Sequence, residues 1–107
     1  MTIFLPDDLQ CFIAERGLFE GFTRTDRPGY VELWPIDDIP RQNASIEIDV
    51  YAPGFLAFGG NGGGEVLVVD ATGAVYTLPL IGMEPKYATK IAESFAQFAD
   101  TFELDRE

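Results

Sequence analysis

The first apolar residues of the chain recur at helical spacing. Leu9, Phe12 and Ile13 fall on one face when this segment is wound as an α-helix. A proline at the start suits the first helical position, and Gly17 is placed to end the helix in a left-handed conformation. The pattern therefore predicts a helix over residues 6–16.

Two later segments alternate between apolar and polar residues, as half-buried strands do. Residues 30–34 place Tyr30 and Trp34 on one face, with valine and leucine on the other. Residues 46–50 place isoleucine and valine on one side and two carboxylates on the other, which predicts a second such strand. Prolines bracket residues 36–39, so an irregular turn or one short helical turn is predicted there.

Three apolar runs in the middle of the chain are separated by glycine-rich turns. They cover residues 55–58, 65–70 and 75–80, and this arrangement predicts a meander of neighbouring antiparallel strands. The run Val66–Val69 is apolar at every position, as in a strand covered on both faces. We therefore expect the middle strand of the meander to be central in the sheet.

A capping signal interrupts what otherwise resembles one long C-terminal helix. Ser94 is followed three residues later by Gln97, which is the pattern of a capping box. We therefore predict a helix that begins at Ser94 and runs to about Glu103, preceded by a short extended piece over residues 88–92.

Composition indicates a small, folded and strongly acidic protein. The 107 residues are 47% hydrophobic, which is enough for one core, so a single domain is predicted over residues 1–107. Seven basic and eighteen acidic residues give a net charge of −11. This charge opposes contact with phosphate backbones and anionic lipid headgroups, so neither nucleic acid nor a membrane is expected as a partner.

The candidate catalytic chemistry is sparse. The chain has no histidine and a single cysteine, Cys11, so the commonest general base, disulfides and cysteine-rich zinc sites are excluded. Pairs such as Asp37 and Asp38 could act as acid and base on a glycoside. However, eighteen carboxylates on a small surface produce close pairs by chance. We therefore expect no enzymatic activity, no metal and no cofactor, and a small hydrolase ranks third among the functional hypotheses.

The N-terminal residues indicate where the protein acts. They lack the basic segment and apolar stretch of a secretory signal. No apolar run approaches the roughly 20 residues that span a bilayer, and the lone Cys11 fits a reducing compartment. A cytoplasmic location is therefore expected.

A glycine-rich segment separates the first two strands of the meander. Backbone N–H groups in such a segment can hold an anion, but a phosphate-binding loop needs Lys and Ser or Thr after the glycines and then a helix. Here Glu65 and a strand follow. We interpret the segment as a structural loop that needs positive φ angles, and its members are Gly59, Gly60, Asn61, Gly62, Gly63 and Gly64.

The order of these pieces resembles the SUKH superfamily. The specific stretch is residues 51–70, which contains the sequences YAPGFLAFG and GGGE. The resemblance also takes in residues 5–6, 17–21, 75–79 and 91–98, and so covers nearly the whole chain. The family is named partly for the yeast Smi-one/Knr-four regulator of cell-wall synthesis, and it is abundant in bacteria as immunity proteins of polymorphic toxin systems.

The resemblance implies an α+β fold in which helices pack on an antiparallel-rich, twisted sheet. It implies non-covalent binding of a toxin, often a nuclease, and supplies no catalytic residues. We therefore expect an immunity protein that binds a basic toxin domain and occludes its active site. The alternative is an intracellular adaptor of the same family that binds proteins but has no toxin partner.

Trp34, Asp37 and Asp38 are the candidate partner-binding residues. An aromatic anchor beside negative charge suits a basic partner, because buried aromatic residues dominate interface energetics and complementary charge accelerates encounter. The other interpretation, that Trp34 is a core residue of its strand, stays open at this stage.

Overall fold

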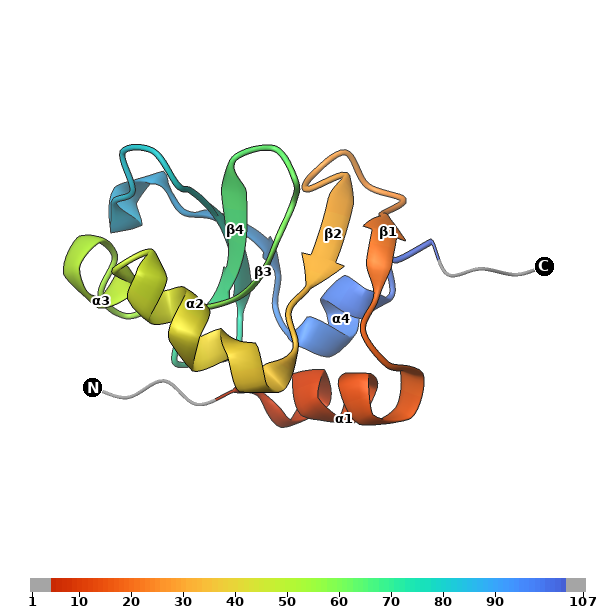
Figure 1. Ribbon diagram of the computed structural model, residues 1–107. Coiled ribbons are helices and arrows are strands. Elements are labelled where there is room, and N and C mark those ends of the chain that lie inside the picture. The colour runs from red at the N-terminus through yellow and green to blue at the C-terminus, as the bar shows by residue number, and fades with distance from the viewer. Residues whose placement is uncertain (1–4, 104–107) are drawn as a thin grey trace.

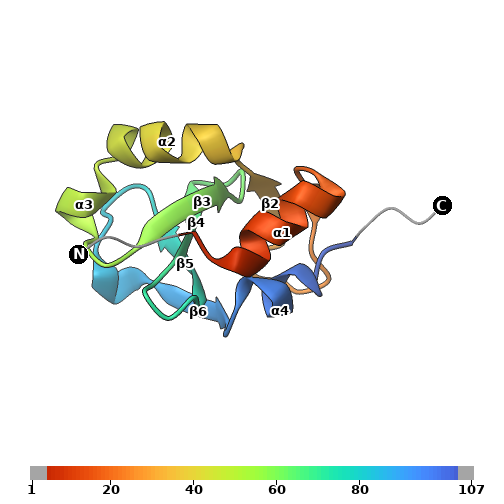
Figure 2. The same ribbon diagram turned by 90° about the horizontal axis from the view of Figure 1, so that it is seen from below.

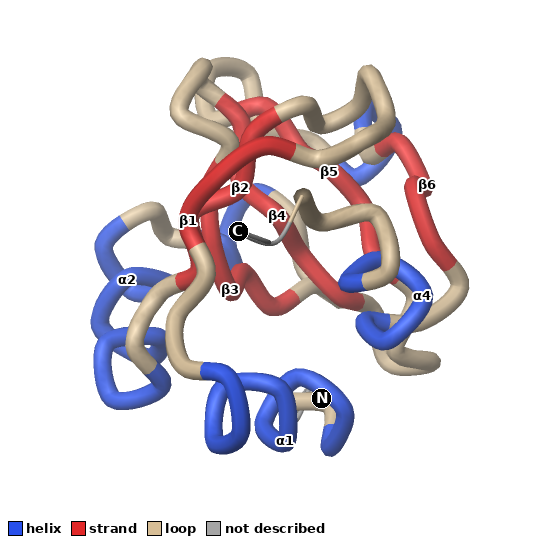
Figure 3. Tube along the Cα trace, turned by 90° about the vertical axis from the view of Figure 1, so that its right-hand side faces the viewer, coloured by secondary structure: helices blue, strands red, loops and turns tan. Residues whose placement is uncertain are grey.

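The computed structural model describes residues 5–103, which form an α+β structure around one curled sheet (Figures 1 and 3). Six strands lie in chain order, and each pairs antiparallel with the next. The strands are β1 (Glu20–Phe22), β2 (Tyr30–Leu33), β3 (Leu56–Gly60), β4 (Glu65–Val69), β5 (Val75–Pro79) and β6 (Thr89–Ala92). The helices are α1 (Asp7–Arg16), α2 (Ile39–Ser45), α3 (Ile48–Tyr51) and α4 (Phe95–Ala99), with the short 3-10 helices η1 (Ile36–Asp38) and η2 (Pro85–Tyr87). The expected fold class is confirmed.

Helix α1 ends where the sequence predicts and begins one residue later, at Asp7 instead of Pro6. Pro6 precedes it in an extended conformation, and Gly17 follows it with a φ of 83°. The Gly17 N–H donates a hydrogen bond to the Ile13 carbonyl at 2.8 Å. Because glycine adopts this left-handed conformation without steric penalty, it ends the helix cleanly. Leu9 is fully buried, and Phe12 packs against the same core.

The strand predicted over residues 46–50 is wrong, because this part of the chain forms α3. Glu47 precedes the helix in a left-handed conformation, with a φ of 55°. Ile48 and Ala52, four positions apart, are buried, whereas Val50 is 70% exposed. The apolar alternation was too short to distinguish strand from helix, and burial follows the helical period.

The helical turn predicted over residues 36–39 is confirmed as η1, but a helix continues beyond it. Pro40 lies in the first turn of α2, where a helix needs no N–H from that residue. Pro40 therefore lies at the start of α2 and does not end the preceding helical turn. Ile39 and Asn43, four positions apart, form its buried face.

The meander in the middle of the chain is confirmed, and β4 is its central strand. Residues Val66–Val69 are all buried. Leu67 and Val69 belong to one hydrophobic cluster, and Val66 and Val68 belong to a second. Strand β4 therefore contributes to a core on each of its faces, as the continuous apolar run predicts.

Helices and loops complete the two clusters on the faces of the sheet. In Figure 2, α1 and α4 lie next to each other on the right, while α3 lies at the left end. The first cluster contains Phe58, Phe95, Phe98 and Phe102, whose rings meet mostly edge to face. The second contains residues of α3 and of the connection between β5 and β6.

The C-terminal capping prediction is confirmed, but the helix is shorter than predicted. The Ser94 hydroxyl oxygen accepts a hydrogen bond from the Gln97 N–H at 3.1 Å. Helix α4 ends at Ala99 instead of near Glu103. The residues beyond it pair with β1, where the Glu103 N–H donates to the Phe22 carbonyl at 2.8 Å. This pairing ends the helix, because a residue bonded to a strand edge cannot continue a helical ladder.

Candidate functional site

Trp34 lies at the end of β2, where the chain turns away from the sheet. Its backbone N–H donates to the Phe58 carbonyl at 3.1 Å. The side chain is half-buried and packs against both hydrophobic clusters. Trp34 therefore joins the two cores and leaves only part of its surface available to a partner.

Asp37 and Asp38 lie together in η1, directly after the turn that follows Trp34. Asp37 is exposed, whereas the Asp38 carboxylate forms an ion pair with Arg41 at 2.9 Å. The structure thus brings both carboxylates to the start of α2, on the surface. Their role in partner binding, and that of Trp34, stays a prediction.

The loop after β3 is shorter than the sequence predicts, because Gly59 and Gly60 belong to the strand. A Cβ atom on Gly59 would lie 2.6 Å from the Glu32 carbonyl oxygen, so β2 can approach this strand only at glycine. Gly62 and Gly64 have positive φ angles, of 75° and 94°. Gly63 does not share this conformation.

Asn61 organises the rest of this loop. Its side-chain oxygen accepts hydrogen bonds from the N–H groups of Gly63 and Glu65, at 2.8 and 3.1 Å. Its amide nitrogen donates to the Glu65 carboxylate at 2.9 Å. Two of the backbone donors that an anion would need are therefore already bound to Asn61.

A buried amide that the sequence analysis missed holds α2 on the sheet. Strand β2 leaves the sheet after Leu33, and the backbone of Ala57 in β3 then lacks a strand neighbour on that side. The Asn43 side chain takes its place, because it accepts from the Ala57 N–H and donates to the Ala57 carbonyl, both at 2.8 Å. It also donates to the Ile39 carbonyl at 2.7 Å. The spacing of Ile39 and Asn43 on one helix face is the signal that could have identified it.

The tight turn between β4 and β5 is organised by Asp70. One carboxylate oxygen accepts from the N–H and hydroxyl of Thr72, at 2.9 and 2.6 Å, and the other accepts from the Tyr76 hydroxyl at 3.0 Å. Partial burial by itself raises the pKa of Asp70, but these hydrogen bonds and those from backbone N–H groups outweigh it and lower the pKa. The hydrogen bond that Tyr76 donates to Asp70 also raises the pKa of the Tyr76 hydroxyl. Both groups therefore stabilise a turn.

A groove with acidic walls runs between α1 and α4, with a volume of about 1210 Å³. Phe12, Ala96 and Ala99 contribute apolar atoms to its lining. Five carboxylates and two guanidinium groups surround them, from Asp7, Asp8, Glu15, Asp100, Glu103, Arg16 and Arg24. The Arg24 guanidinium is held by the backbone, because it donates to the carbonyls of Asp100 and Phe102.

At the end of the molecule opposite this groove, apolar side chains are exposed to solvent. Seven large apolar or tyrosine side chains are exposed within residues 5–103, and five of them lie in α3 or in the connection between β5 and β6. We call these five the apolar end, and they are Val50, Tyr51, Leu80, Ile81 and Tyr87. Figures 1 and 2 both place α3 next to η2, which contains Tyr87.

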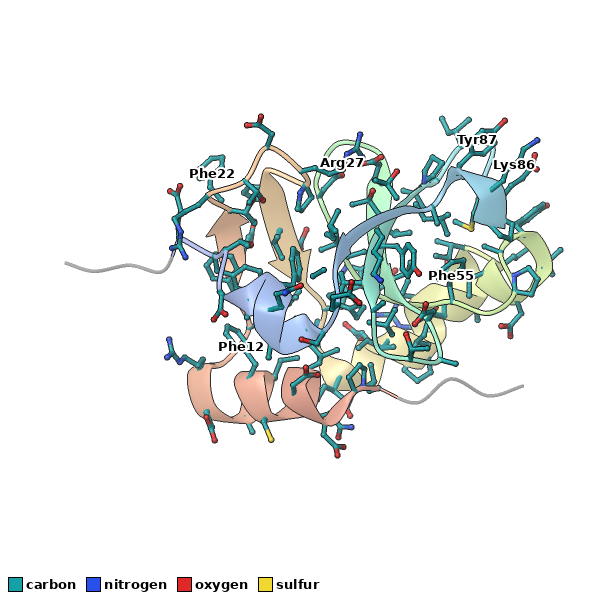
Figure 4. All side chains as sticks on the ribbon, turned by 180° about the vertical axis from the view of Figure 1, so that it is seen from behind. Phe12, Phe22, Arg27, Phe55, Lys86 and Tyr87 are labelled. Atoms are coloured by element: carbon teal, nitrogen blue, oxygen red, sulfur yellow. The ribbon has the colours of Figure 1, made fainter. Side chains whose placement is uncertain are left out.

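The charges around the apolar end are mostly negative. Glu47, Asp49 and Glu84 are exposed in the same elements. Lys86 lies 3.7 Å from the Glu84 carboxylate and 5.2 Å from the centre of the Tyr87 ring. Figure 4 shows the Lys86 and Tyr87 side chains together at the outer edge of the molecule. Lys86 therefore offsets the charge of Glu84, and Glu47 and Asp49 leave these segments with a net negative charge.

Among the helices of residues 5–103, none has the length and apolar character that crossing a bilayer requires. The same residues hold no group of three or more His, Cys, Asp or Glu side chains arranged to bind a metal ion.

Comparison with known proteins identifies the family of the chain. No curated protein matches it. The family model that matches is SMI1 / KNR4 family (SUKH-1), and it covers residues 1–101. Its span includes the six strands of the sheet, the helices packed on it and the apolar end. The chain therefore belongs to the SMI1/KNR4 family, SUKH-1.

Proposed function

We propose that this SUKH-1 chain is a non-catalytic immunity protein that acts in the cytoplasm. It binds a co-encoded toxin domain, of the nuclease type, and occludes the active site or the substrate channel. The observation that supports this most strongly is the family match over residues 1–101, because the SUKH resemblance implies such a binding role.

The electrostatics of the chain support a basic protein partner. The net charge is −11. A nuclease that attracts phosphate backbones presents positive charge, and the same charge attracts an acidic protein. Long-range attraction accelerates encounter between two such partners by orders of magnitude at low salt.

The side-chain chemistry supports binding instead of catalysis. The Asp70 carboxylate already accepts hydrogen bonds from Thr72, Ala74 and Tyr76. Within residues 5–103, each buried side-chain nitrogen or oxygen has a hydrogen-bond partner. These polar groups stabilise the fold, while the exposed apolar and acidic side chains are available to a partner.

A co-expression experiment tests the proposal. The toxin domain encoded by the adjacent gene is expressed in a sensitive host, alone or with this chain, and growth and degradation of nucleic acid are measured. We expect the chain to restore growth and to inhibit the purified toxin at a one-to-one molar ratio.

Two results would contradict the proposal. If the chain leaves the purified toxin fully active at molar excess, it is not an immunity protein for that toxin. If it instead binds another protein stably without changing its activity, the adaptor interpretation replaces the immunity function.

A further inference from the structure

We propose that the apolar end is the docking surface for the protein partner, and that the partner presents an apolar pocket bordered by lysine and arginine. This inference rests on the proposed function and adds to it the place and the chemistry of recognition. The apolar end lies beyond the C-terminal end of α2, whereas Asp37 and Asp38 lie at its N-terminal end (Figure 1).

The side chains of the apolar end are exposed to solvent. Ile81 is 93% exposed and Tyr51 is 53% exposed. Single apolar side chains on a surface are ordinary, but a concentration of them in one place marks an interaction site. Tyrosine is among the residues that contribute most to binding when a partner covers them.

The backbone that carries these side chains is held in place by buried and hydrogen-bonded residues. Met83 is buried in the same cluster as Ile48 and Ala52, so the connection after β5 is anchored where α3 is anchored. The Tyr87 N–H donates to the Glu84 carbonyl at 3.0 Å and completes the turn of η2. A surface that is already ordered loses little conformational entropy when it binds.

Charge determines which occupant fits. Glu47, Asp49 and Glu84 are exposed in the same segments as the apolar side chains. The charge of Lys86 offsets that of Glu84, so Glu47 and Asp49 leave the apolar end with a net negative charge. A second copy of this chain would bring the same carboxylates face to face, and like charges across an interface repel. In a partner with an apolar pocket bordered by lysine and arginine, the pocket would bind the exposed apolar side chains and the basic residues would pair with the carboxylates.

A binding experiment with matched variants tests the assignment. The probe is the purified toxin domain encoded by the adjacent gene, in an inactivated form, and its binding to the full chain is followed by surface plasmon resonance. We expect Ile81→Ser and Tyr51→Ala each to raise the Kd about tenfold or more, mainly through faster dissociation. Leu18→Ser is the control, because Leu18 is 50% exposed but lies between α1 and β1.

A charge variant tests the basic rim of the partner separately. We expect Asp49→Lys to slow association at low salt, whereas Asp26→Lys, in the connection between β1 and β2, changes it much less. Equal effects of the two reversals would show that only net charge matters and would overturn the assignment of a basic rim.

The remaining outcomes distinguish the surface from the function. Binding that is strong for the wild type and unchanged in Ile81→Ser overturns this surface but leaves the immunity function intact. Failure of the wild type to bind overturns both. A wild-type dimer that Ile81→Ser converts to a monomer, measured by light scattering, identifies a second copy as the occupant and overturns the inference.

Discussion

The Asp8 carboxylate accepts a hydrogen bond from the backbone N–H of Ala96 at 2.9 Å. Asp8 lies in the first turn of α1, and Ala96 lies in the first turn of α4. The contact therefore joins two helices from opposite ends of the chain and satisfies an N–H that α4 itself cannot bond. A negative charge is also favourable at the N-terminal end of a helix.

Asp8→Ala should lower the free energy of unfolding by about 1 kcal/mol, because the variant leaves that N–H without its acceptor. Urea unfolding followed by circular dichroism measures the change. Asp7→Ala is the matched control, since Asp7 precedes Asp8 in the same turn and is exposed. Equal losses in the two variants would show that the contact with Ala96 adds nothing to the dipole effect.

Asn43→Ala should be among the most destabilising single substitutions in α2. It removes the partners of both backbone groups of Ala57 inside the core, and each unsatisfied buried group costs about 1–3 kcal/mol. We expect a loss of about 2 kcal/mol or more in urea unfolding. Ser45→Ala, at an exposed position of the same helix, should change stability by about 0.5 kcal/mol at most.

The effect of an alanine substitution on stability should differ among the glycines of this loop, according to the backbone conformation at each position. Alanine at Gly62 or Gly64 should cost about 1 kcal/mol, because both have positive φ angles. Gly63→Ala should be tolerated, since the nearest atom to an added Cβ is 3.6 Å away. Thermal melts of the three variants measure this order. Nucleotides should not raise the melting temperature of the wild type, and a rise that the Gly64 variant loses would indicate a binding site in the loop.

Asp70 should make stability depend on pH in the acid range. Its pKa in the folded protein is below the ordinary value of 3.8, so ionisation stabilises the fold. This contribution is complete above the ordinary pKa and is lost as the pH falls through the lower, folded value. The difference in unfolding free energy between the wild type and Asp70→Asn should therefore be constant above about pH 5 and shrink below about pH 4. Asp49→Asn provides the control curve, and a pH-independent difference would contradict this role of Asp70.

Reversal of Asp37 and Asp38 to lysine tests the binding site predicted from sequence. If these carboxylates lie in or beside the interface with the proposed toxin, the association rate should fall and its dependence on salt should weaken. If the partner docks at the apolar end, their reversal should change the association rate no more than Asp26→Lys does. The fold should remain intact, because exposed charges contribute little to stability. Stopped-flow kinetics across a salt series measure both effects. An association rate that is independent of salt in the wild type would remove the electrostatic argument.

Local signals predicted the elements whose ends depend on nearby residues. Gly17 ends α1 through its own conformation, and Ser94 begins α4 through its own hydroxyl. The continuous apolar run of β4 likewise indicated a strand with a core on both faces.

The elements that were missed depend on distant contacts. Helix α2 is held by Asn43 against a strand that comes later in the chain, and α4 is shortened because Glu103 bonds to β1. The spacing of Ile39 and Asn43 is a local signal for the buried face of α2, but no local pattern shows that Asn43 bonds to Ala57 or that Glu103 bonds to Phe22. For the same reason the sequence could not show the apolar end, since α3 and the connection after β5 come together only through the buried cluster that contains Ile48 and Met83.

The pairing of residues 101–103 with β1 has a consequence for the biosynthesis of the protein. Strand β1 is made early, but one of its edges is covered only when Thr101 and Glu103 have left the ribosome. Until then the nascent chain presents an open strand edge, which is a template for pairing with other chains. A chain truncated after Asp100 would keep that edge open permanently, and its main defect would be aggregation.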